Sequence, residues 1–416
     1  MVLDIEEDDE EVINRFQLSI RARIFVLQAL LLGLILVTAN IGVMTSSQGQ
    51  IGSVDDSPNL TDTNQTPREI NTENFTGDIG DTEEDLPVII FLEEPGEHEP
   101  VWSRVYENRG KFKPHAIVES GDGGFVLTGD MGLDAFFMKI DSDGNEVWKK
   151  IYGGNYSDFA NDVIPTQDGS FIVAGSSCTG SECSVADQGY VVKVAGNGSI
   201  LWEKTYEGSI KRVAGSSENG YLMTGDKLTR IDDAGNVIWT RDYEGLGHVI
   251  DVDGGENFVF VIPRESISKI DLEGRHIWNC SMREGSVVRC LVEAQDGAII
   301  AAGYLEGHGY LMKIDPAGVK VWEKTYQGNG SEFFYSVDTT SDGGLVTAGS
   351  TCSFGEGFFD VHVTRLNPDG ELLWHSNYGL GDDWGWDISS AGNRFIVAAE
   401  TGDLSPDVYL LCFSEE

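Results

Sequence analysis

One short hydrophobic motif recurs seven times along the chain. Each copy reads apolar-Trp-x-x-x-aromatic, as in VWSRVY (101–106) and VWEKTY (321–326), and in one copy Met282 replaces the second aromatic residue. Because strand side chains alternate with a period of two, both large side chains of a copy lie on one face of a strand. A single strand cannot bury two rings, whereas stacked sheets can. Repetition at intervals of roughly 37 to 54 residues therefore predicts a β-propeller.

Turn signals divide each repeat into four strands. The first hairpin turn is of the Asp-Gly type, as at Asp122-Gly123, and a second Gly turn precedes each Trp strand after the first. The second strands are small and apolar, as in FVLTG (125–129), which suits the tapered centre of a propeller. The last repeat ends without a Trp strand, and VWSRVY precedes every other strand of the repeats. We therefore predict an all-β, seven-bladed propeller over 98–416, with four-stranded blades and an N-terminal strand that closes the last blade.

An uncharged apolar segment covers residues 24–44. Its length at the rise of an α-helix spans one bilayer core of about 30 Å. Arg15, Arg21 and Arg23 precede it, so the positive-inside rule places the tail 1–23 in the cytoplasm and the propeller outside the cell. We expect an uncleaved transmembrane signal-anchor helix preceding the propeller, and a cleaved signal peptide is the alternative.

Residues 45–97 form an acidic, polar segment that we interpret as a stalk. Residues 45–84 show no apolar period, so they cannot offset the entropy of ordering, whereas LPVIIFL (86–92) predicts a short strand that packs on the propeller. Several Asn-x-Ser/Thr triplets predict N-glycosylation. The candidate acceptors are Asn59, Asn64, Asn74, Asn155, Asn197 and Asn329.

The charge of the chain excludes one class of partner. The 416 residues carry 28 Lys and Arg against 69 Asp and Glu, for a net charge of −41. Such a surface repels phosphate backbones, so we expect no nucleic-acid partner. Among six cysteines, Cys178 and Cys183 lie in one loop and predict a local disulfide outside the cell. Cys280, Cys290 and Cys412 are expected to be buried apolar residues.

The repeats resemble those of a known class of propellers. IDSDGNEVWKKIYGG (140–154) and SDFANDVIPTQDGSFIVAGSS (157–177) are similar to repeats of secreted or membrane-anchored archaeal and bacterial proteins of the quinoprotein-like (PQQ-like) class. The resemblance covers about 100–416 and implies that each Trp docks against the next blade. The docking residues would be Trp102, Trp148, Trp202, Trp239, Trp278, Trp322 and Trp374.

The same class contains quinone-dependent dehydrogenases, whose hallmarks are missing here. Many of them place two adjacent cysteines over the quinone, and this chain has no Cys-Cys and no Cys-x-x-Cys-His. We therefore expect no cofactor. The sequence also shows no nucleophile triad, zinc spacing or phosphate loop, so we assign no catalytic and no metal residue.

Two repeated patterns have structural interpretations. The stretch from Asp141 to Glu146 resembles part of a calcium loop, but it also fits a hairpin turn, which we prefer. Basic residues recur in the third strands, and an Asp two residues later, as in Lys139 and Asp141, predicts ion pairs between strands.

All long loops fall on one face, because the first and third connections of every repeat are short. These loops carry aromatic and acidic residues suited to binding a peptide, a sugar or a cation. The alternative is that the recurring Gly-x-x-Asp/Glu-aromatic pattern only seats the first strand of each blade. The candidate binding residues are Tyr156, Phe159, Phe333, Phe334, Asp382, Asp383, Trp384 and Trp386.

Together these features predict a membrane-anchored, extracellular propeller that is a non-enzymatic binding or scaffolding module of the cell envelope. Its partner would be a protein or a glycan. The alternative is an enzyme on a propeller scaffold, either a quinone-dependent dehydrogenase or a carbohydrate-active hydrolase or lyase.

Overall fold

The computed structural model describes residues 87–106, 111–180, 188–215, 220–242, 247–252, 256–355, 358–379, 381–402 and 407–415. The predicted tail (1–23), the anchor (24–44) and the sequons at Asn59, Asn64 and Asn74 lie outside these residues. Within the described residues, no helix is long and apolar enough to cross a membrane.

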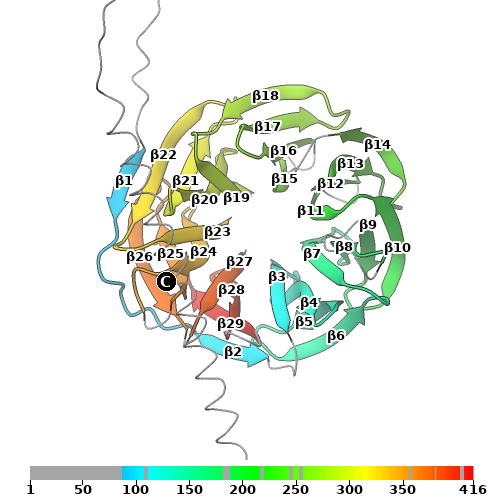
Figure 1. The fold of residues 1–416 in the computed structure, drawn as a ribbon, viewed down its shortest axis with the longest axis horizontal. Coiled ribbons are helices and arrows are strands. Elements are labelled where there is room, and N and C mark those ends of the chain that lie inside the picture. Colours follow the sequence, from blue (N-terminus) through cyan, green and yellow to red (C-terminus); the bar gives the residue numbers. More distant parts are fainter. Residues whose placement is uncertain are drawn as a thin grey trace, which may run out of the picture. The chain divides into compact units, whose positions relative to one another are not determined.

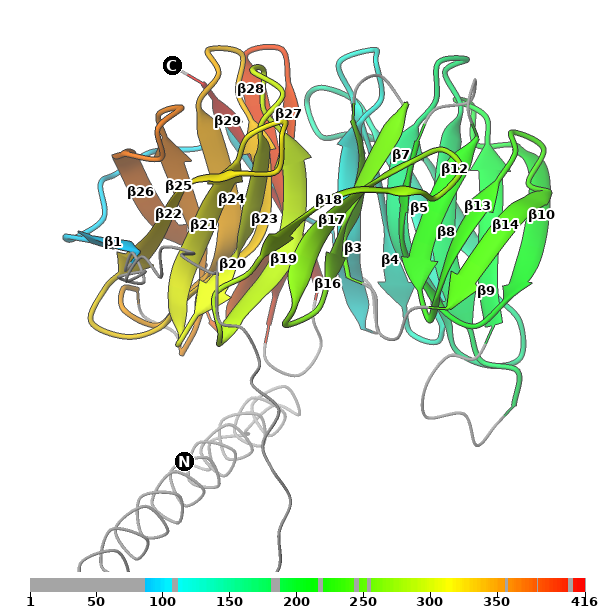
Figure 2. The same ribbon diagram turned by 90° about the horizontal axis from the view of Figure 1, so that it is seen from above.

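The described strands form seven sheets that stand around a central channel (Figure 1). Each sheet is a blade, in which one edge strand lines the channel and the opposite edge strand lies at the rim. Seen from the side, the strands run between two faces of the ring (Figure 2).

The blades are numbered in chain order, and their strands are given from the channel outwards. Blade 1 contains β3 (Phe112–Glu119), β4 (Phe125–Met131), β5 (Asp134–Ile140) and β6 (Glu146–Tyr152). Blade 2 contains β7 (Asp158–Pro165), β8 (Phe171–Ser177), β9 (Gln188–Val194) and β10 (Ile200–Glu207). Blade 3 contains β11 (Ile210–Ala214), β12 (Tyr221–Gly225), β13 (Lys227–Ile231) and β14 (Val237–Asp242). Blade 4 contains β15 (Val249–Val252), β16 (Asn257–Ile262), β17 (Ser266–Asp271) and β18 (His276–Ser281).

The remaining blades follow the same plan with two additions. Blade 5 contains β19 (Ser286–Glu293), β20 (Ile299–Leu305), β21 (His308–Ile314), β22 (Lys320–Gln327) and the extra edge strand β1 (Val88–Phe91). Blade 6 contains β23 (Glu332–Thr339), β24 (Leu345–Thr351), β25 (Asp360–Leu366) and β26 (Leu372–Tyr378). Blade 7 contains β27 (Asp383–Ala391), β28 (Arg394–Thr401), β29 (Asp407–Ser414) and β2 (Trp102–Tyr106).

The apolar core lies between blades rather than within them. Each cluster of buried side chains joins two neighbouring sheets, as where Phe137 of β5 and Tyr190 of β9 share one cluster between blades 1 and 2. Another cluster joins Phe136 of blade 1 to Leu410 of blade 7. A blade therefore buries its second and third strands only when both neighbours are present.

The outer strands dock on the next blade through their aromatic residues. The indole Nε1 groups of Trp102, Trp148 and Trp278 donate to carbonyls of the following blade's outer turn at 3.0, 3.0 and 3.1 Å. The second aromatic residue of the motif makes a similar bond. Four residues after Trp322, the hydroxyl of Tyr326 donates to the carbonyl of Gly370 in the outer turn of the following blade. Within the described residues, these aromatic side chains of the outer strands therefore face the neighbouring blade and not their own.

Glycine is required where the indole rests on the turn. Gly318 has a φ of +89°, and an added Cβ would lie 2.6 Å from the ring of Trp278. The glycine thus supplies both the left-handed backbone and the space for the ring.

Blade 7 has its outer strand from the N-terminal side of the propeller. Strand β2 pairs antiparallel with β29, and the register runs from Trp102 opposite Cys412 to Tyr106 opposite Val408. This is the pairing that closure by an N-terminal strand requires. Closure of the ring in solution stays a prediction.

A strap of residues 93–100 occupies the place where blade 7 lacks an outer turn. The ring of His98 stacks on Trp374 of β26, with centroids 4.2 Å apart and an angle of 17°. The hydroxyls of Ser376 and Tyr378 donate to the strap carbonyls of Gly96 and His98. The strap therefore gives the indole of blade 6 the contact that a turn gives the others.

The strap continues a belt that begins at β1. Strand β1 pairs in parallel with β22, from Val88 opposite Lys324 to Phe91 opposite Gln327. Blade 5 consequently has five strands, whereas four were expected. Residues 88–106 thus contact the outer strands of blades 5 and 6 and supply that of blade 7 (Figure 1).

The basic residues of the third strands do form repeated ion pairs, but their partner is an Asp of the first turn and not the Asp two residues later. Lys139 pairs at 2.6 Å with Asp122 of the first turn and not with Asp141. Hydrogen bonding to Lys139 lowers the pKa of Asp122 to about 2. Asp141 lies beyond the strand end, where its carboxylate accepts the backbone N–H groups of Asp143 and Asn145 within the hairpin turn.

Deleting residues 98–110 should lower the melting temperature by several degrees or more. The deletion removes β2, the docking of Trp102 on Ser142 and the stacking of His98 on Trp374. Differential scanning calorimetry measures the effect, with Val105→Thr at an exposed position of the same strand as control. An unchanged melting temperature of the deletion variant would contradict closure by β2.

Candidate functional site

The inner strands of six blades carry a one-residue β-bulge at the same position. In blade 1, Pro114 pairs with Gly129 and Ala116 with Thr128, so His115 has no partner across the ladder. A bulge of this kind re-aims the extra side chain, often next to a site. The six bulged residues are His115, Asn161, Lys211, Arg289, Tyr335 and Trp386.

Glycine in the second strand accounts for the bulges. An added Cβ on Gly129 would lie 1.9 Å from the carbonyl oxygen of Lys113, and one on Gly349 would lie 1.7 Å from that of Phe333. In blade 7 the glycine is on the inner strand, where Gly385 faces Ala399. The recurring Thr-Gly or Ala-Gly at the end of the second strands is therefore a sequence signal for the bulges.

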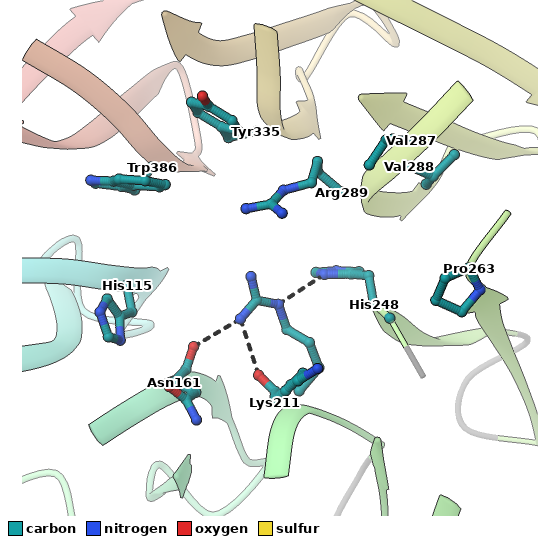
Figure 3. Close-up of a pocket in the computed structure, with 12 residues that line it drawn as sticks. His115, Asn161, Lys211, His248, Pro263, Val287, Val288, Arg289, Tyr335 and Trp386 are labelled. Atoms are coloured by element: carbon teal, nitrogen blue, oxygen red, sulfur yellow. Dashed lines mark hydrogen bonds between the residues drawn. The ribbon is translucent and has the colours of Figure 1, made fainter. Parts of the chain in front are cut away.

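All six bulged side chains line one cavity of about 410 Å³ at the channel. Figure 3 shows them around an open centre, with the guanidinium of Arg289 directed into it. The bulges lie near the beginning of the inner strands, where the long fourth-to-first-strand connections enter. The cavity therefore belongs to the long-loop end of the channel.

Arg212 is held rigidly in the wall of the cavity. Its Nε donates to Nδ1 of His248 at 3.0 Å, and one terminal nitrogen donates to the carbonyls of Asn161 and Lys211 at 3.0 Å each. Burial and the neighbouring Arg212 keep the pKa of His248 well below its usual value. His248 is thus neutral, and because Nδ1 accepts, its proton is on Nε2.

Below the cavity, side chains of successive inner strands form a polar chain. Nε2 of His248 lies 3.8 Å from Sγ of Cys290, and the hydroxyl of Ser336 lies 3.6 Å from the same sulfur. The Ser336 hydroxyl also lies 2.6 Å from Oδ1 of Asp387. These groups link blades 4 to 7 around the channel.

Cys290 and His248 do not form an activated nucleophile. Burial raises the pKa of the Cys290 thiol to about 12, so it stays protonated. The facing Nε2 carries a proton and cannot accept another. The contact is therefore structural.

Aspartates near the channel connect neighbouring blades. Asp162 of blade 2 accepts the backbone N–H of Val213 in blade 3 at 2.8 Å, and Asp387 of blade 7 accepts that of Ile117 in blade 1 at 2.8 Å. Burial raises the pKa of Asp162 to about 6 and also raises that of Asp387. These carboxylates therefore join neighbouring sheets by hydrogen bonds, and they do not form a catalytic pair.

Tyr335 and Trp386 make an aromatic wall beside the cationic groups. Their rings stack with centroids 5.1 Å apart, and the guanidinium of Arg289 lies 5.5 Å from the ring centroid of Tyr335. The indole Nε1 of Trp386 donates to the buried Glu400, which is also paired with Lys113 of blade 1 at 2.8 Å. Trp386 is therefore fixed in place.

The structure brings some of the predicted binding residues together. Phe333 and Trp384 each lie 6.0 Å from Phe359 between ring centroids, and Phe333 stacks on Tyr335 at 6.3 Å. This aromatic cluster of blades 6 and 7 is continuous with the cavity wall. Tyr156, 38% exposed, and the half-buried Phe159 belong to blade 2 and lie outside the cluster.

Two predicted binding residues are wrong. Phe334 and Asp383 are fully buried and cannot contact a partner. Asp383 instead accepts the backbone N–H of Gly381 at 3.0 Å, so here the acid seats the first strand of the blade. Asp382 likewise holds a loop, because it accepts the N–H of Phe358 at 2.8 Å.

Other predicted sites are only partly described. Cys178 is disulfide-bonded, but Cys183 lies outside the described residues, so the pairing stays a prediction. Asn155, Asn197 and Asn329 are exposed, and their glycosylation stays a prediction.

The bulged residues were missed by sequence reasoning, apart from Trp386. His115, Asn161, Lys211, Arg289 and Tyr335 differ in chemistry, so no shared residue type marks them. The available signal was the second-strand glycine that pairs with the residue before each of them, which the sequence alone presents only as a small residue near a tapered centre.

Comparison with known proteins supports the fold class. Residues 187–349 match the family model described as "Outer membrane protein assembly factor BamB", which supports a PQQ-like β-propeller repeat protein. A comparison with curated proteins found no match.

Solved propellers share the fold at low sequence identity. The chain is similar to the WD40 β-propeller domain of Doa1 (15% identity, 76% of this chain and 97% of that chain covered, TM-score 0.54). It is also similar to the β-propeller domain of Cps50 (Swd1) from Myceliophteria thermophila (10% identity, 74% of this chain and 99% of that chain covered, TM-score 0.55). The WD40 repeats of RRP9 are similar too (10% identity, 76% of this chain and 99% of that chain covered, TM-score 0.56).

In the native protein, a thiol-alkylating reagent should modify Cys352 and leave Cys290 unmodified. Cys352 is exposed, whereas burial keeps Cys290 as the thiol. Mass spectrometry of peptides after labelling at pH 7.5 measures this, and labelling in denaturant gives the control for reagent access. Rapid native labelling of Cys290 would show that the His248–Cys290 pair is activated after all.

Proposed function

We propose that this PQQ-like propeller is a non-catalytic binding or scaffolding module of the cell envelope whose long-loop end holds a protein partner. The observation that carries the proposal is the set of six bulges. They aim six side chains into one open cavity, and none of the six is a Ser, Cys, Asp or Glu. The aromatic cluster of Phe333, Phe359 and Trp384 extends that cavity towards the rim of the same face.

The alternative, an enzyme on a propeller scaffold, receives less support from the geometry. A catalytic site needs polar groups that are free to exchange protons with a substrate. Here Asp162 and Asp387 accept backbone N–H groups of neighbouring blades, and His248 is neutral with both ring nitrogens engaged. These hydrogen bonds and contacts connect neighbouring blades of the ring.

The cellular location is part of the proposal. The apolar stretch 24–44 and the arginines before it support a single-pass anchor with a cytoplasmic N-terminus. The propeller would then act outside the cell at the membrane surface, where a disulfide at Cys178 is stable.

Protease added to intact cells should release the propeller by cutting within 45–84. The polar composition of this stretch predicts an accessible chain, and the proposed topology places it outside. Immunoblotting with a tag at each end follows the fragments, and cells lysed before digestion give the control. Digestion that occurs only after lysis would reverse the orientation.

Partner capture should depend on the long-loop face. We expect Trp384→Ala and Phe358→Ala to weaken capture by about 2 kcal/mol or more, as truncation of an aromatic anchor does at an interface. Phe358 is 54% exposed and packs on Phe359, so its removal leaves the core intact. Crosslinking in intact cells followed by mass spectrometry measures the captured partners.

The matched control is Asn145→Ala in a turn on the opposite face. Asn145 is exposed, and its side chain bonds only within its own turn. All variants must first show the melting temperature of the unmodified protein. Capture that falls only with Asn145→Ala would place the working surface on the other face.

A further inference from the structure

We propose that the cavity at the channel mouth binds carboxylates of an acidic peptide segment, held by Lys211, Arg212 and Arg289. The inference rests on the proposed binding function and names the chemistry of the partner. The inference concerns the cavity at the inner strands, and carboxylate binding there does not depend on Phe359 and Trp384.

The first argument is a charge imbalance. The chain has 69 acidic side chains for 28 Lys and Arg, so a basic side chain easily finds a partner. Lys113, Lys139 and Arg365 illustrate this, with carboxylates at 2.6 to 2.8 Å. Within the described part of the chain, Lys211, Arg212 and Arg289 form no ion pair, although all three line one cavity.

The acids nearest the cavity are already engaged. Asp130 is paired with His115 at 3.1 Å, and Glu400 is paired with Lys113 at 2.8 Å. Asp162 and Asp387 accept backbone N–H groups of neighbouring blades. The charge of Arg212 also acts on both of these aspartates, where it opposes the rise in their pKa that burial causes. The positive charge left at the opening of the cavity is therefore that of Lys211 and Arg289, and such charge attracts anions.

The two guanidinium groups are presented as recognition groups. Three hydrogen bonds fix Arg212, and Arg289 is directed into the open centre beside the ring of Tyr335 (Figure 3). A planar guanidinium such as that of Arg289 binds a carboxylate through two parallel hydrogen bonds. Arg212 offers only its second terminal nitrogen, because its Nε and its first terminal nitrogen already donate to His248, Asn161 and Lys211. Lys211 is exposed and adds a mobile cation at the same opening.

The aromatic wall favours a peptide over a small inorganic anion. Tyr335 and Trp386 stack beside the cations and offer an apolar surface to the methylene groups of Asp or Glu side chains. Phe333 continues this surface towards Phe359 and Trp384, so a segment can leave the cavity along aromatic rings. A volume of about 410 Å³ accommodates a few residues.

Fluorescence anisotropy of a short dye-labelled peptide tests the assignment with the full-length chain. The probe alternates Glu with Gly, and the matched peptide has Gln in place of each Glu. We expect the Glu peptide to bind and the Gln peptide to bind at least about tenfold more weakly. Lys211→Met and Arg289→Met should each weaken binding of the Glu peptide about tenfold, because each removes a charged hydrogen-bond donor.

Two exposed cations outside the cavity serve as controls. Lys150→Met in β6 and Arg275→Met after β17 make the same charge changes and should leave peptide affinity within about twofold. All four variants keep their long apolar stems and are compared only if their melting temperatures match. Equal losses in the control variants would reduce the effect to net charge and overturn the site.

The remaining outcomes separate this inference from the proposed function. Inorganic phosphate that displaces the peptide at equal ionic strength and low millimolar concentration would show a general anion site and overturn the peptide assignment. If the Glu and Gln peptides bind alike while partner capture depends on Trp384, the carboxylate inference fails and the binding module stands. If the Glu peptide binds through Arg289 while capture ignores the long-loop face, the proposed function fails instead.

Discussion

The docking of each outer-strand indole on the next blade's turn is the contact on which the ring depends. Trp148 and Trp278 donate to turn carbonyls of the following sheet, and the glycines there leave space for the rings. In the part of the chain that the structure describes, the aromatic side chains of the outer strands are buried against a neighbouring blade, so the burial is cooperative around the ring. Blade 6 demonstrates the requirement, because its neighbour lacks the turn and the strap supplies His98 to stack on Trp374 instead.

Much of the architecture was predictable because it follows from side-chain periodicity. The Trp strands, the glycine turns and the small second strands all recur, and this recurrence turns weak local signals into a prediction of seven blades, six of which have four strands in the structure. The strap and the parallel pairing of β1 with blade 5 were not predictable in the same way. EEPGEHEP (93–100) has no repeat partner, and its role follows from what is missing next to Trp374.

The candidate site was harder to predict because bulges shift the register by one residue. An inner strand interpreted as strictly alternating places Tyr335 and Arg289 on the wrong face, since one extra residue inverts the pattern. Acidic residues were misleading for a different reason. Asp383 and Asp141 satisfy backbone N–H groups at strand ends and turns, a role that any acidic sequence near a turn can serve.

Stability and recognition are consequently separated along each blade. The outer end is held by indoles and glycines whose replacement disrupts an interface between sheets. At the inner end, Asp162, Asp387 and Arg212 bond to neighbouring strands, whereas the bulged Lys211 and Arg289 give up a ladder position and project into the cavity. Residues freed from the ladder in this way can differ from blade to blade without cost to the ring, which is why His, Asn, Lys, Arg, Tyr and Trp occupy equivalent positions. The bulge therefore relaxes the requirements of folding at these six positions, so that their side chains are available for the binding role proposed for the cavity.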